Sequence, residues 1–511
     1  MVVTTARFVA ALALLIARAA VANVDGTLDA SLHPPLGTQP FYGIPGLVDF
    51  AVDYGGAAPS TNNDRAAAVL PRPDGTIIVA GTSWAPGPTR SNHLGVIARF
   101  LPDGTLDTAF GIGGRATIGD PDSYDLTVNS IAAQSDRVLV AVSYRLVSDP
   151  STEYAMLVRL DAEGNVLDIP IGGNADERAN HGFNKVITDA DGNIYVAGYW
   201  NASGGTRLEV TFAGPNAGAG NEASFNFPLG SGADGARALD LILRHMPGQS
   251  CGQGCFIPAH DEVMTAGSVY RGIYPDGLAN HDCVVAAFRR NLDDLFFGID
   301  PGFNGGNPLL IDFPAGGTNE GDNYCRAVAP RDGSGVVVGG ENYFLSTLGG
   351  GSPGLASNYA LAEVDESGAV TRQDAFAFFQ SLATQGVYNG IVGMRREAGG
   401  KLLVTGLAGT GDAGRAPSDA GVIRFNADYS RDATFGNDGA GLAILSLDNQ
   451  AGLAGAQREQ ARAIALDTHG RIVVVGDRSY NLAGGNDYDW LVARLVASDV
   501  IFRDGFDNDV P

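Results

Sequence analysis

The feature that most constrains this chain is an imperfect repeat of roughly sixty to seventy residues, which occurs seven times. Each copy has a strand rich in Ala and Val, a tight turn, and a second strand that ends in Val-Ala-Gly or a variant. A third strand follows, and most copies then have Asp-Gly and Phe-Gly. The landmark residues that end the second strands are Gly81, Val142, Gly198, Gly267, Gly340, Gly406 and Gly476. Such self-similarity predicts an array of similar units, so the fold must be derived for the whole chain.

The first unit shows most clearly what each copy forms. Residues 66–70 (AAAVL) and 76–80 (TIIVA) flank a Pro-Asp-Gly turn, and 94–100 (LGVIARF) leads through a second such turn to 115–118. Asp-Gly between apolar stretches favours a hairpin, because Gly accepts the positive φ that the turn needs. Each unit is therefore predicted to be a four-stranded antiparallel meander.

The ends of the chain share one unit. The seventh unit has only three strands, whereas residues 25–29 repeat the pentapeptide DGTLD of 103–107 and lead through 41–46 into 47–52. A closed ring explains this split, because closure leaves only short sheet edges. We predict an all-β fold: a seven-bladed β-propeller of four-stranded antiparallel blades, its ring closed by the N-terminal strand completing the last blade. A long insertion at 246–258 in the fourth unit leaves an eight-bladed ring as the alternative.

The first residues have the layout of a secretory signal peptide. Arg7 precedes the apolar run 8–17, and Ala20-Val21-Ala22 is a small-x-small cleavage site. We therefore predict a signal peptide at 1–22, one propeller domain at 23–499 and a C-terminal tail at 500–511. No later stretch has the roughly eighteen apolar residues of a membrane span. The expected product is a monomer that is exported to the periplasm, the cell surface or the medium.

The tail, residues 500–511, allows two interpretations. It resembles a short segment that ends many exported proteins of some Gram-negative bacteria, which would make it a sorting signal. It also fits a final edge strand packed on the seventh blade.

The composition and charge agree with an exported β protein. Gly accounts for 71 of the 511 residues, about double its usual share, and much of it punctuates turns. The formal net charge is −24. An acidic surface repels phosphate backbones, so we expect no nucleic-acid partner.

Four cysteines follow the predicted cleavage site: Cys251, Cys255, Cys283 and Cys325. An even count in an exported chain predicts disulfides, and the favoured pairs are Cys251–Cys255 and Cys283–Cys325. The second pair would join the fourth and fifth units. A zinc site with the nearby His260 and His281 is the rival, but the spacing matches no CxxC pair.

The repeat resembles a known family. Val-Ala-Gly, then Ala-Arg-Phe, then Pro-Asp-Gly-Thr-Leu-Asp-Thr-Ala-Phe-Gly is similar to the bacterial delta-60 repeat, best at 72–118 and next at 422–446 and 462–495. Weaker copies fill most of the rest. The resemblance implies a propeller-like layout and no shared catalytic residues.

Motifs that carry chemistry are weak. Gly350-Gly351-Ser352-Pro353-Gly354 fits G-x-S-x-G, but its flanks are loop-like where a nucleophile elbow needs a strand and a helix. The stretch 189–193 (DADGN) resembles the start of a calcium loop and lacks the downstream Glu, so a hairpin turn is favoured. The seven His form no HExxH or HxH pair. We expect no catalytic residues, no metal and no cofactor, and the repeated Trp motif of quinone-dependent propellers is absent.

Two functions remain open. The favoured one is a non-enzymatic binding or scaffold module for a protein or glycan, with Trp84 and Trp200, expected in loops of one face, as possible sugar-stacking residues. The alternative is a glycan-acting hydrolase or lyase with carboxylates at the channel mouth. Asp64, Asp240 and Glu320 are candidates, but the sequence does not show that two of them converge.

Overall fold

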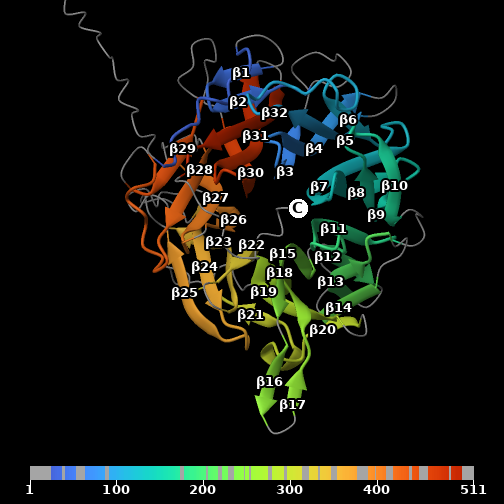
Figure 1. The fold of residues 1–511 in the computed structure, drawn as a ribbon, viewed down its shortest axis with the longest axis vertical. Helices are drawn as coiled ribbons and strands as arrows, with labels where there is room; N and C mark the ends of the chain where they lie inside the picture. The colour runs from blue at the N-terminus through green and yellow to red at the C-terminus, as the bar shows by residue number, and fades with distance from the viewer. Residues whose placement is uncertain are drawn as a thin grey trace, which may run out of the picture.

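The computed structural model shows seven blades arranged in a ring (Figure 1). It describes residues 25–36, 41–52, 64–86, 91–172, 178–202, 205–216, 221–227, 235–246, 248–252, 255–273, 279–292, 296–313, 322–331, 334–346, 354–376, 390–397, 399–409, 418–436, 440–447, 458–482 and 485–497. The signal peptide predicted at 1–22 and the tail at 500–511 lie outside these ranges and stay predictions.

Five blades are four-stranded antiparallel sheets whose strands follow one another in chain order. Blades 1 and 2 contain β3 (Arg65–Pro71), β4 (Ile77–Pro86), β5 (Ser91–Phe100), β6 (Arg115–Ile118), β7 (Tyr124–Gln134), β8 (Arg137–Leu146), β9 (Asp149–Leu160) and β10 (Val166–Ile171). Blade 3 contains β11 (His181–Thr188), β12 (Ile194–Ala202), β13 (Gly205–Ala213) and β14 (Asn221–Phe227). Blades 5 and 6 contain β22 (Asp322–Pro330), β23 (Val336–Ser346), β24 (Gly354–Val364), β25 (Val370–Phe376), β26 (Gly390–Arg396), β27 (Leu402–Gly409), β28 (Ser418–Phe425) and β29 (Leu442–Leu445).

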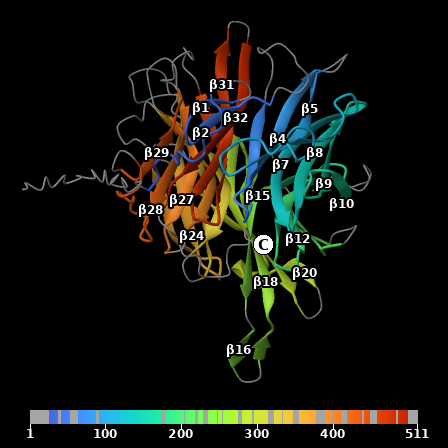
Figure 2. The same cartoon turned by 45° about the horizontal axis from the view of Figure 1, so that its top comes forward.

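Blade 4 differs from these five at its rim and in its insertion. Its sheet contains β15 (Arg237–Met246), β18 (His260–Ile273), β19 (Ala279–Asn291) and an outer strand split into β20 (Phe297–Ile299) and β21 (Leu309–Ile311) around the 3-10 turn η1 (Asn304–Gly306). The insertion forms a separate hairpin, β16 (Gln249–Gly252) and β17 (Cys255–Ile257), which projects from the ring (Figure 2). The described residues therefore form seven blades, and the insertion contributes a hairpin where the alternative required an eighth blade.

Blade 7 joins the two ends of the chain. It contains β30 (Arg458–Leu466), β31 (Ile472–Leu482), β32 (Gly485–Leu495), β2 (Leu47–Phe50) and β1 (Phe41–Ile44). Strand β2 pairs antiparallel with β32, so that Leu47 lies opposite Ala493 and Phe50 opposite Trp490. The predicted closure of the ring by the N-terminal segment is confirmed.

The core of the protein lies between the blades. The buried hydrophobic residues of the described chain form seven clusters, and each cluster joins two neighbouring blades. The cluster between blades 7 and 1 contains Val48 and Phe50 from β2, Val79 and Phe100 from blade 1, and Trp490 from β32. Burial of apolar surface thus holds the first and last blades together as it holds the others.

In blades 1 and 6, residues of the repeat signature contact the next blade, Phe110 at Gly164 and Phe435 at Gly26. In three blades an Arg of the third strand pairs with an Asp of the following corner, with N–O distances of 2.7–2.8 Å: Arg99 with Asp107, Arg424 with Asp432, and Arg494 with Asp29. The Phe-Gly corner then contacts the next blade's turn. A Cβ on Gly164 of blade 2 would lie 2.9 Å from the ring of Phe110, so this contact requires Gly.

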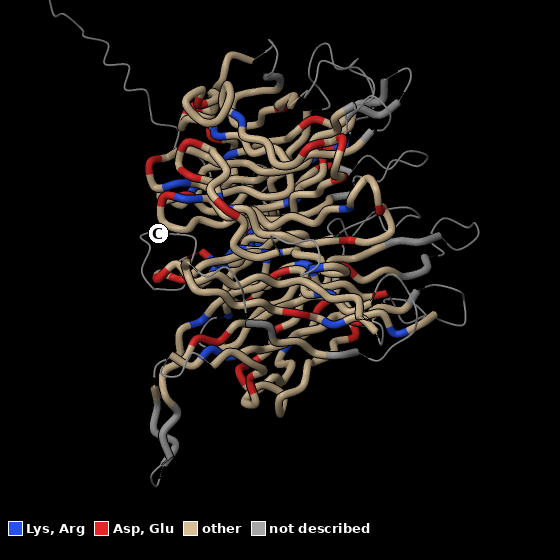
Figure 3. Tube along the Cα trace, turned by 90° about the vertical axis from the view of Figure 1, so that its right-hand side faces the viewer, with Lys and Arg blue, Asp and Glu red and all other residues tan. Residues whose placement is uncertain are grey.

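Charged residues lie throughout the ring, with Asp and Glu in the turns as well as the strands (Figure 3). In the Asp74-Gly75 and Asp103-Gly104 turns, the Asp of the pair itself holds the turn. In blade 1, Oδ1 of Asp74 accepts hydrogen bonds from both the backbone N–H (2.9 Å) and the hydroxyl (2.7 Å) of Thr76. These hydrogen bonds outweigh the effect of burial, which alone would raise the pKa of Asp74, and hold that pKa below its usual value. Part of the acidity of the chain therefore serves its turns.

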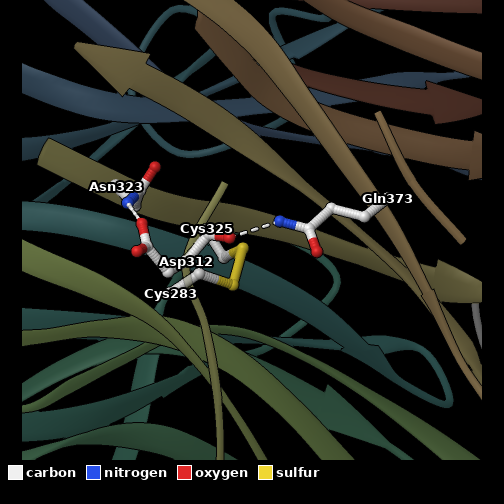
Figure 4. The surroundings of a disulfide bond; sticks show 5 residues. All are labelled: Cys283, Asp312, Asn323, Cys325 and Gln373. Atoms are coloured by element: carbon white, nitrogen blue, oxygen red, sulfur yellow. Dashed lines mark hydrogen bonds between the residues drawn. A yellow bond between two sulfur atoms is a disulfide. The ribbon is translucent and has the colours of Figure 1, made fainter. Parts of the chain in front are cut away.

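A disulfide joins blades 4 and 5. Cys283 of β19 and Cys325 of β22 are bonded across 42 residues of sequence, which is the pairing favoured above. Beside it, Nδ2 of Asn323 donates to Oδ1 of Asp312 at 2.7 Å, and the side-chain amide of Gln373 donates to the Asp312 carbonyl (Figure 4). The side chains of Cys251 and Cys255, in the β16–β17 hairpin, lie outside the described part of the structure, so their pairing stays a prediction.

Removing this crosslink is expected to destabilise the ring. A bond that closes a loop of this length restricts the unfolded chain, and its loss lowers the free energy of unfolding by roughly 2–4 kcal/mol. Chemical denaturation of the Cys283→Ala/Cys325→Ala double variant measures the change. Adding reductant should lower the midpoint of the parent protein, and a midpoint that reduction leaves unchanged would contradict the prediction.

Candidate functional site

The innermost strands of all seven blades surround a central cavity of about 110 Å³. These strands, β3, β7, β11, β15, β22, β26 and β30, lie nearest the centre of the ring (Figure 1). Each contributes residues that line the cavity. We call this cavity the channel. It is the natural candidate site, because a cavity reached by every blade lets residues far apart in sequence converge on one ligand.

Each innermost strand carries one β-bulge at the same place, just after the residue that pairs with the landmark position. A bulge inserts a residue with no partner on the second strand and re-aims it. The inserted residues are Ala67, Asn129, Asn184, Leu239, Arg326, Val392 and Arg462. All seven line the channel.

The bulge explains the landmark Gly of the repeat. A Cβ on Gly340 would lie 1.6 Å from the carbonyl oxygen of Tyr324, and a Cβ on Gly406 would lie 1.8 Å from that of Gly390. The innermost strand approaches so closely that a side chain is excluded in six blades. Blade 2 is the exception, with Val142 opposite Val128.

The channel wall is rich in cations. Lys185, Arg326, Arg395 and Arg462 line it, and Asp240 is the one carboxylate among the described lining residues. The three arginines come from consecutive blades, 5, 6 and 7. One arc of the wall is therefore basic in a protein whose net charge is −24.

Two of these arginines are held in the same way. The Nε of Arg326 donates to Oε1 of Glu341 at 2.7 Å, and the Nε of Arg462 donates to Oδ1 of Asp477 at 2.7 Å. Glu341 and Asp477 each follow the landmark Gly of their own blade. The arginine side chains are 40% and 37% exposed to solvent, whereas the carboxylates are 6% and 1% exposed. Buried acids thus orient cations that face the channel.

The buried Glu341 carboxylate helps to raise the pKa values of two neighbouring side chains, Arg326 and Tyr343. Burial alone would lower the pKa of Arg326, but the Glu341 carboxylate outweighs it and raises that pKa above its ordinary value. Burial, and the charge and hydrogen bond of the same carboxylate, raise the pKa of Tyr343. Arg326 therefore stays cationic and Tyr343 stays neutral across the physiological pH range.

Of the three carboxylates suggested by the sequence, the described structure includes two, and only Asp240 lines the channel. Asp240 lines the channel, where Oδ1 lies 3.4 Å from Nζ of Lys185 and Oδ2 accepts the Val328 N–H at 3.0 Å. Asp64 is buried, and its backbone N–H donates to the Tyr488 carbonyl at 3.0 Å. Glu320 lies outside the described residues.

Trp84 and Trp200 lie within strands, which corrects their placement in loops. The second and third strands extend as long hairpins, so that Trp84 pairs with His93 and Trp200 with Arg207. The Trp200 indole is stacked on His181, with ring centroids 5.4 Å apart, and the Arg207 guanidinium lies over it at 4.5 Å. The contacts of Trp200 with His181 and Arg207 occupy ring surface that a stacked sugar would need. Sugar stacking by either residue stays a prediction.

The described residues contain no group of three or more His, Cys, Asp or Glu side chains placed to hold a metal ion. Cys283 and Cys325 are bonded to each other and offer no thiolate. His281, the nearby candidate ligand, instead contacts Oδ1 of Asp322 through Nδ1 at 2.8 Å. The zinc alternative gains no support here.

The remaining motifs are accounted for by turns or lie outside the description. Oδ1 of Asp189 accepts the backbone N–H groups of Asp191 (3.0 Å) and Asn193 (2.8 Å), as Oδ1 of Asp161 does for Glu163 and Asn165 in blade 2. Ser352 lies outside the described residues, so the G-x-S-x-G motif is untested.

The basic residues of the channel were missed by the sequence reasoning, although a signal for some of them was present. Arg326, Val392 and Arg462 each precede their landmark Gly by 14 residues, as Ala67 and Asn184 do. A fixed offset from the landmark therefore identifies channel-facing positions wherever the first hairpin has its ordinary length.

One family model matches part of the chain. Residues 72–110 match a family model described as "Domain of unknown function (DUF5122) beta-propeller". No curated protein sequence matches the chain. A propeller repeat family is consistent with the ring, and the delta-60 identity of the repeat remains a resemblance.

Solved structures with low sequence identity are similar in part. A luciferin-regenerating enzyme has 9% identity and a TM-score of 0.33, with 89% of this chain and 97% of that one covered. Drosophila Semaphorin 2a has 8% identity and a TM-score of 0.40, with coverages of 86% and 75%. Penicillium chrysogenum α-L-arabinanase has 11% identity and a TM-score of 0.38, with coverages of 71% and 92%.

Proposed function

We propose that this chain is an exported β-propeller that binds a ligand in its central channel and releases it unchanged. The observation that supports this proposal most is that three carboxylates at or behind the channel wall are each paired with a cation of the wall. Asp240 contacts Lys185, Glu341 contacts Arg326, and Asp477 contacts Arg462. The described wall thus supplies oriented positive charge.

Hydrolysis of a glycosidic bond needs a different arrangement. Two carboxyl groups must flank the bond, one donating a proton and the other acting as nucleophile or base. In this channel Asp240 is the single lining carboxylate among the described residues, and a lysine and a backbone N–H engage it. The geometry therefore favours binding over a glycan-acting hydrolase that uses paired carboxylates at the channel.

Export has separate support. The Cys283–Cys325 disulfide is typical of proteins that fold in an oxidising compartment. Within the described ranges, no helix has the length and apolar character required to cross a bilayer. Together with the predicted signal peptide, the disulfide supports a product outside the cytoplasm.

A glycan array read for both retention and cleavage tests the proposal. Because the wall supplies positive charge, we expect the purified mature chain to retain one or more glycans that carry an acidic sugar and to release them with unchanged mass. The Asp240→Asn variant serves as the control, because any turnover by a carboxylate at the wall would be lost there. Time-dependent cleavage by the parent protein that this variant lacks would contradict a binding role.

A further inference from the structure

The channel also indicates the chemical class of what it binds. We infer that Arg326 and Arg462 form a binding site for the carboxylate of a small organic acid. This inference rests on the proposed binding function and names the ligand class of the same site. The inference starts from an arrangement that occurs in blades 5 and 7. A bulge places an arginine in the channel, and the acidic residue that follows the landmark Gly accepts a hydrogen bond from its Nε.

The contacts of the two arginines leave donors for a ligand. Arg326 uses Nε and Nη2 on Oε1 of Glu341. Arg462 uses Nε on Asp477 and Nη2 on Oε1 of Gln460, at 2.9 Å. A guanidinium carries five N–H donors in a rigid plane, so each side chain keeps further N–H groups, and more than a third of each side chain is exposed. Because the buried acids fix the side chains in advance, a ligand loses less affinity to their ordering.

The planar fork of a guanidinium matches the two oxygens of a carboxylate. Arg395 stands on the blade between those of Arg326 and Arg462, and Lys185 lines the wall from blade 3. Four cations therefore surround a cavity in which Asp240 is the one described carboxylate. An anionic group is stabilised there by charge as well as by hydrogen bonds.

The rest of the wall selects an organic acid over an inorganic anion. Leu70, Ile131, Val392 and Ile464 line the same cavity and give it apolar surface that a carbon chain would cover. A volume of about 110 Å³ holds several water molecules or a short organic acid. The net charge of −24 disfavours large polyanions, whereas a single negative charge meets little repulsion.

Three small probes separate these contributions in calorimetric titrations of the full mature chain. Butyrate carries the carboxylate and a short apolar chain, butyramide is its uncharged isostere, and inorganic phosphate has charge without the chain. We expect butyrate to bind at least about tenfold more tightly than butyramide, because it alone gains charge-assisted hydrogen bonds. Raising the salt concentration should weaken butyrate binding and leave butyramide unaffected.

Variants assign the site. The Arg326→Gln/Arg462→Gln double variant should lose at least about tenfold in butyrate affinity. Arg372→Gln is the matched control, because Arg372 is 42% exposed and ion-paired with Asp374 on the rim strand β25 of blade 5. Its affinity should equal that of the parent. If the double variant fails to fold, Arg326→Lys/Arg462→Lys keeps the charges without the planar forks and should still weaken butyrate binding.

The inference would be overturned by equal affinity for butyrate and butyramide, by equal affinity for phosphate and butyrate, or by unchanged affinity in a folded double variant. Failure of butyrate to bind would also overturn it. In that case, glycan retention on the array would leave the proposed binding function standing, whereas cleavage on the array would remove that function by itself.

Discussion

Replacing Gly406 by Ala is expected to lower the free energy of unfolding by roughly 3 kcal/mol or more. The new Cβ would lie 1.8 Å from the carbonyl oxygen of Gly390, a separation that folded proteins do not tolerate. Strand β26 would have to move away from β27, which also disturbs the bulge at Val392. Chemical denaturation followed by circular dichroism measures the loss.

The matched control is Gly302→Ala. The nearest atom to a Cβ at Gly302, its chain neighbours aside, is Oδ1 of Asp300 at 3.2 Å, and the next lies 4.0 Å away. We expect a change below about 1 kcal/mol at this position. Equal losses at the two positions would show that the landmark Gly is not required by the bulge.

Replacing Phe50 by Ala is expected to cost roughly 3–5 kcal/mol, the usual range for a fully buried aromatic side chain. Phe50 is fully buried in β2. Its ring lies 5.1 Å from that of Phe100 in blade 1 and 6.1 Å from that of Trp490 in β32. One side chain therefore joins the N-terminal strand to both blades at the closure of the ring.

Phe296→Ala removes the same side chain where it is 54% exposed and should cost less than about 1 kcal/mol. The denaturation midpoints of both variants measure the difference. A Phe50→Ala variant as stable as the control would mean that the N-terminal strand does not hold the ring closed.

The architecture was predictable because it depends on features that recur. Seven landmarks give seven blades, and the repeated DGTLD segment places the N-terminus in the last blade. The signature itself encodes contacts: Arg99 of the third strand meets Asp107 of the corner that follows it. Because the pattern recurs seven times, the fold can be predicted even where the sequence of a single copy departs from the pattern.

The channel was harder to predict, because a bulge leaves little trace in the alternation of polar and apolar residues. Around Arg326, the strand Asp322–Pro330 shows alternating burial that a bulge interrupts, and its sequence does not reveal which face Arg326 takes. The arginines were obscured further because each comes from a different repeat. Only the ring brings Arg326 and Arg462 to the same wall.

The fourth blade and the two tryptophans show a second limit, which concerns strand length. The outer strand of blade 4 is split by residues 300–308, and the hairpins that carry Trp84 and Trp200 extend past the ends of the shorter strands predicted for them. The tight turn between the first two strands of a blade marks where the second strand begins, at the face opposite the variable loops. It does not fix how far a hairpin extends at the face where loops vary.

A crystal structure of the mature protein grown with butyrate tests most directly that the channel is the ligand site. We expect density for butyrate inside the channel, with its carboxylate on the guanidinium groups of Arg326 and Arg462 and its chain toward Ile464. A channel that holds only ordered water, with butyrate absent or bound to the outer surface of the blades, would contradict it.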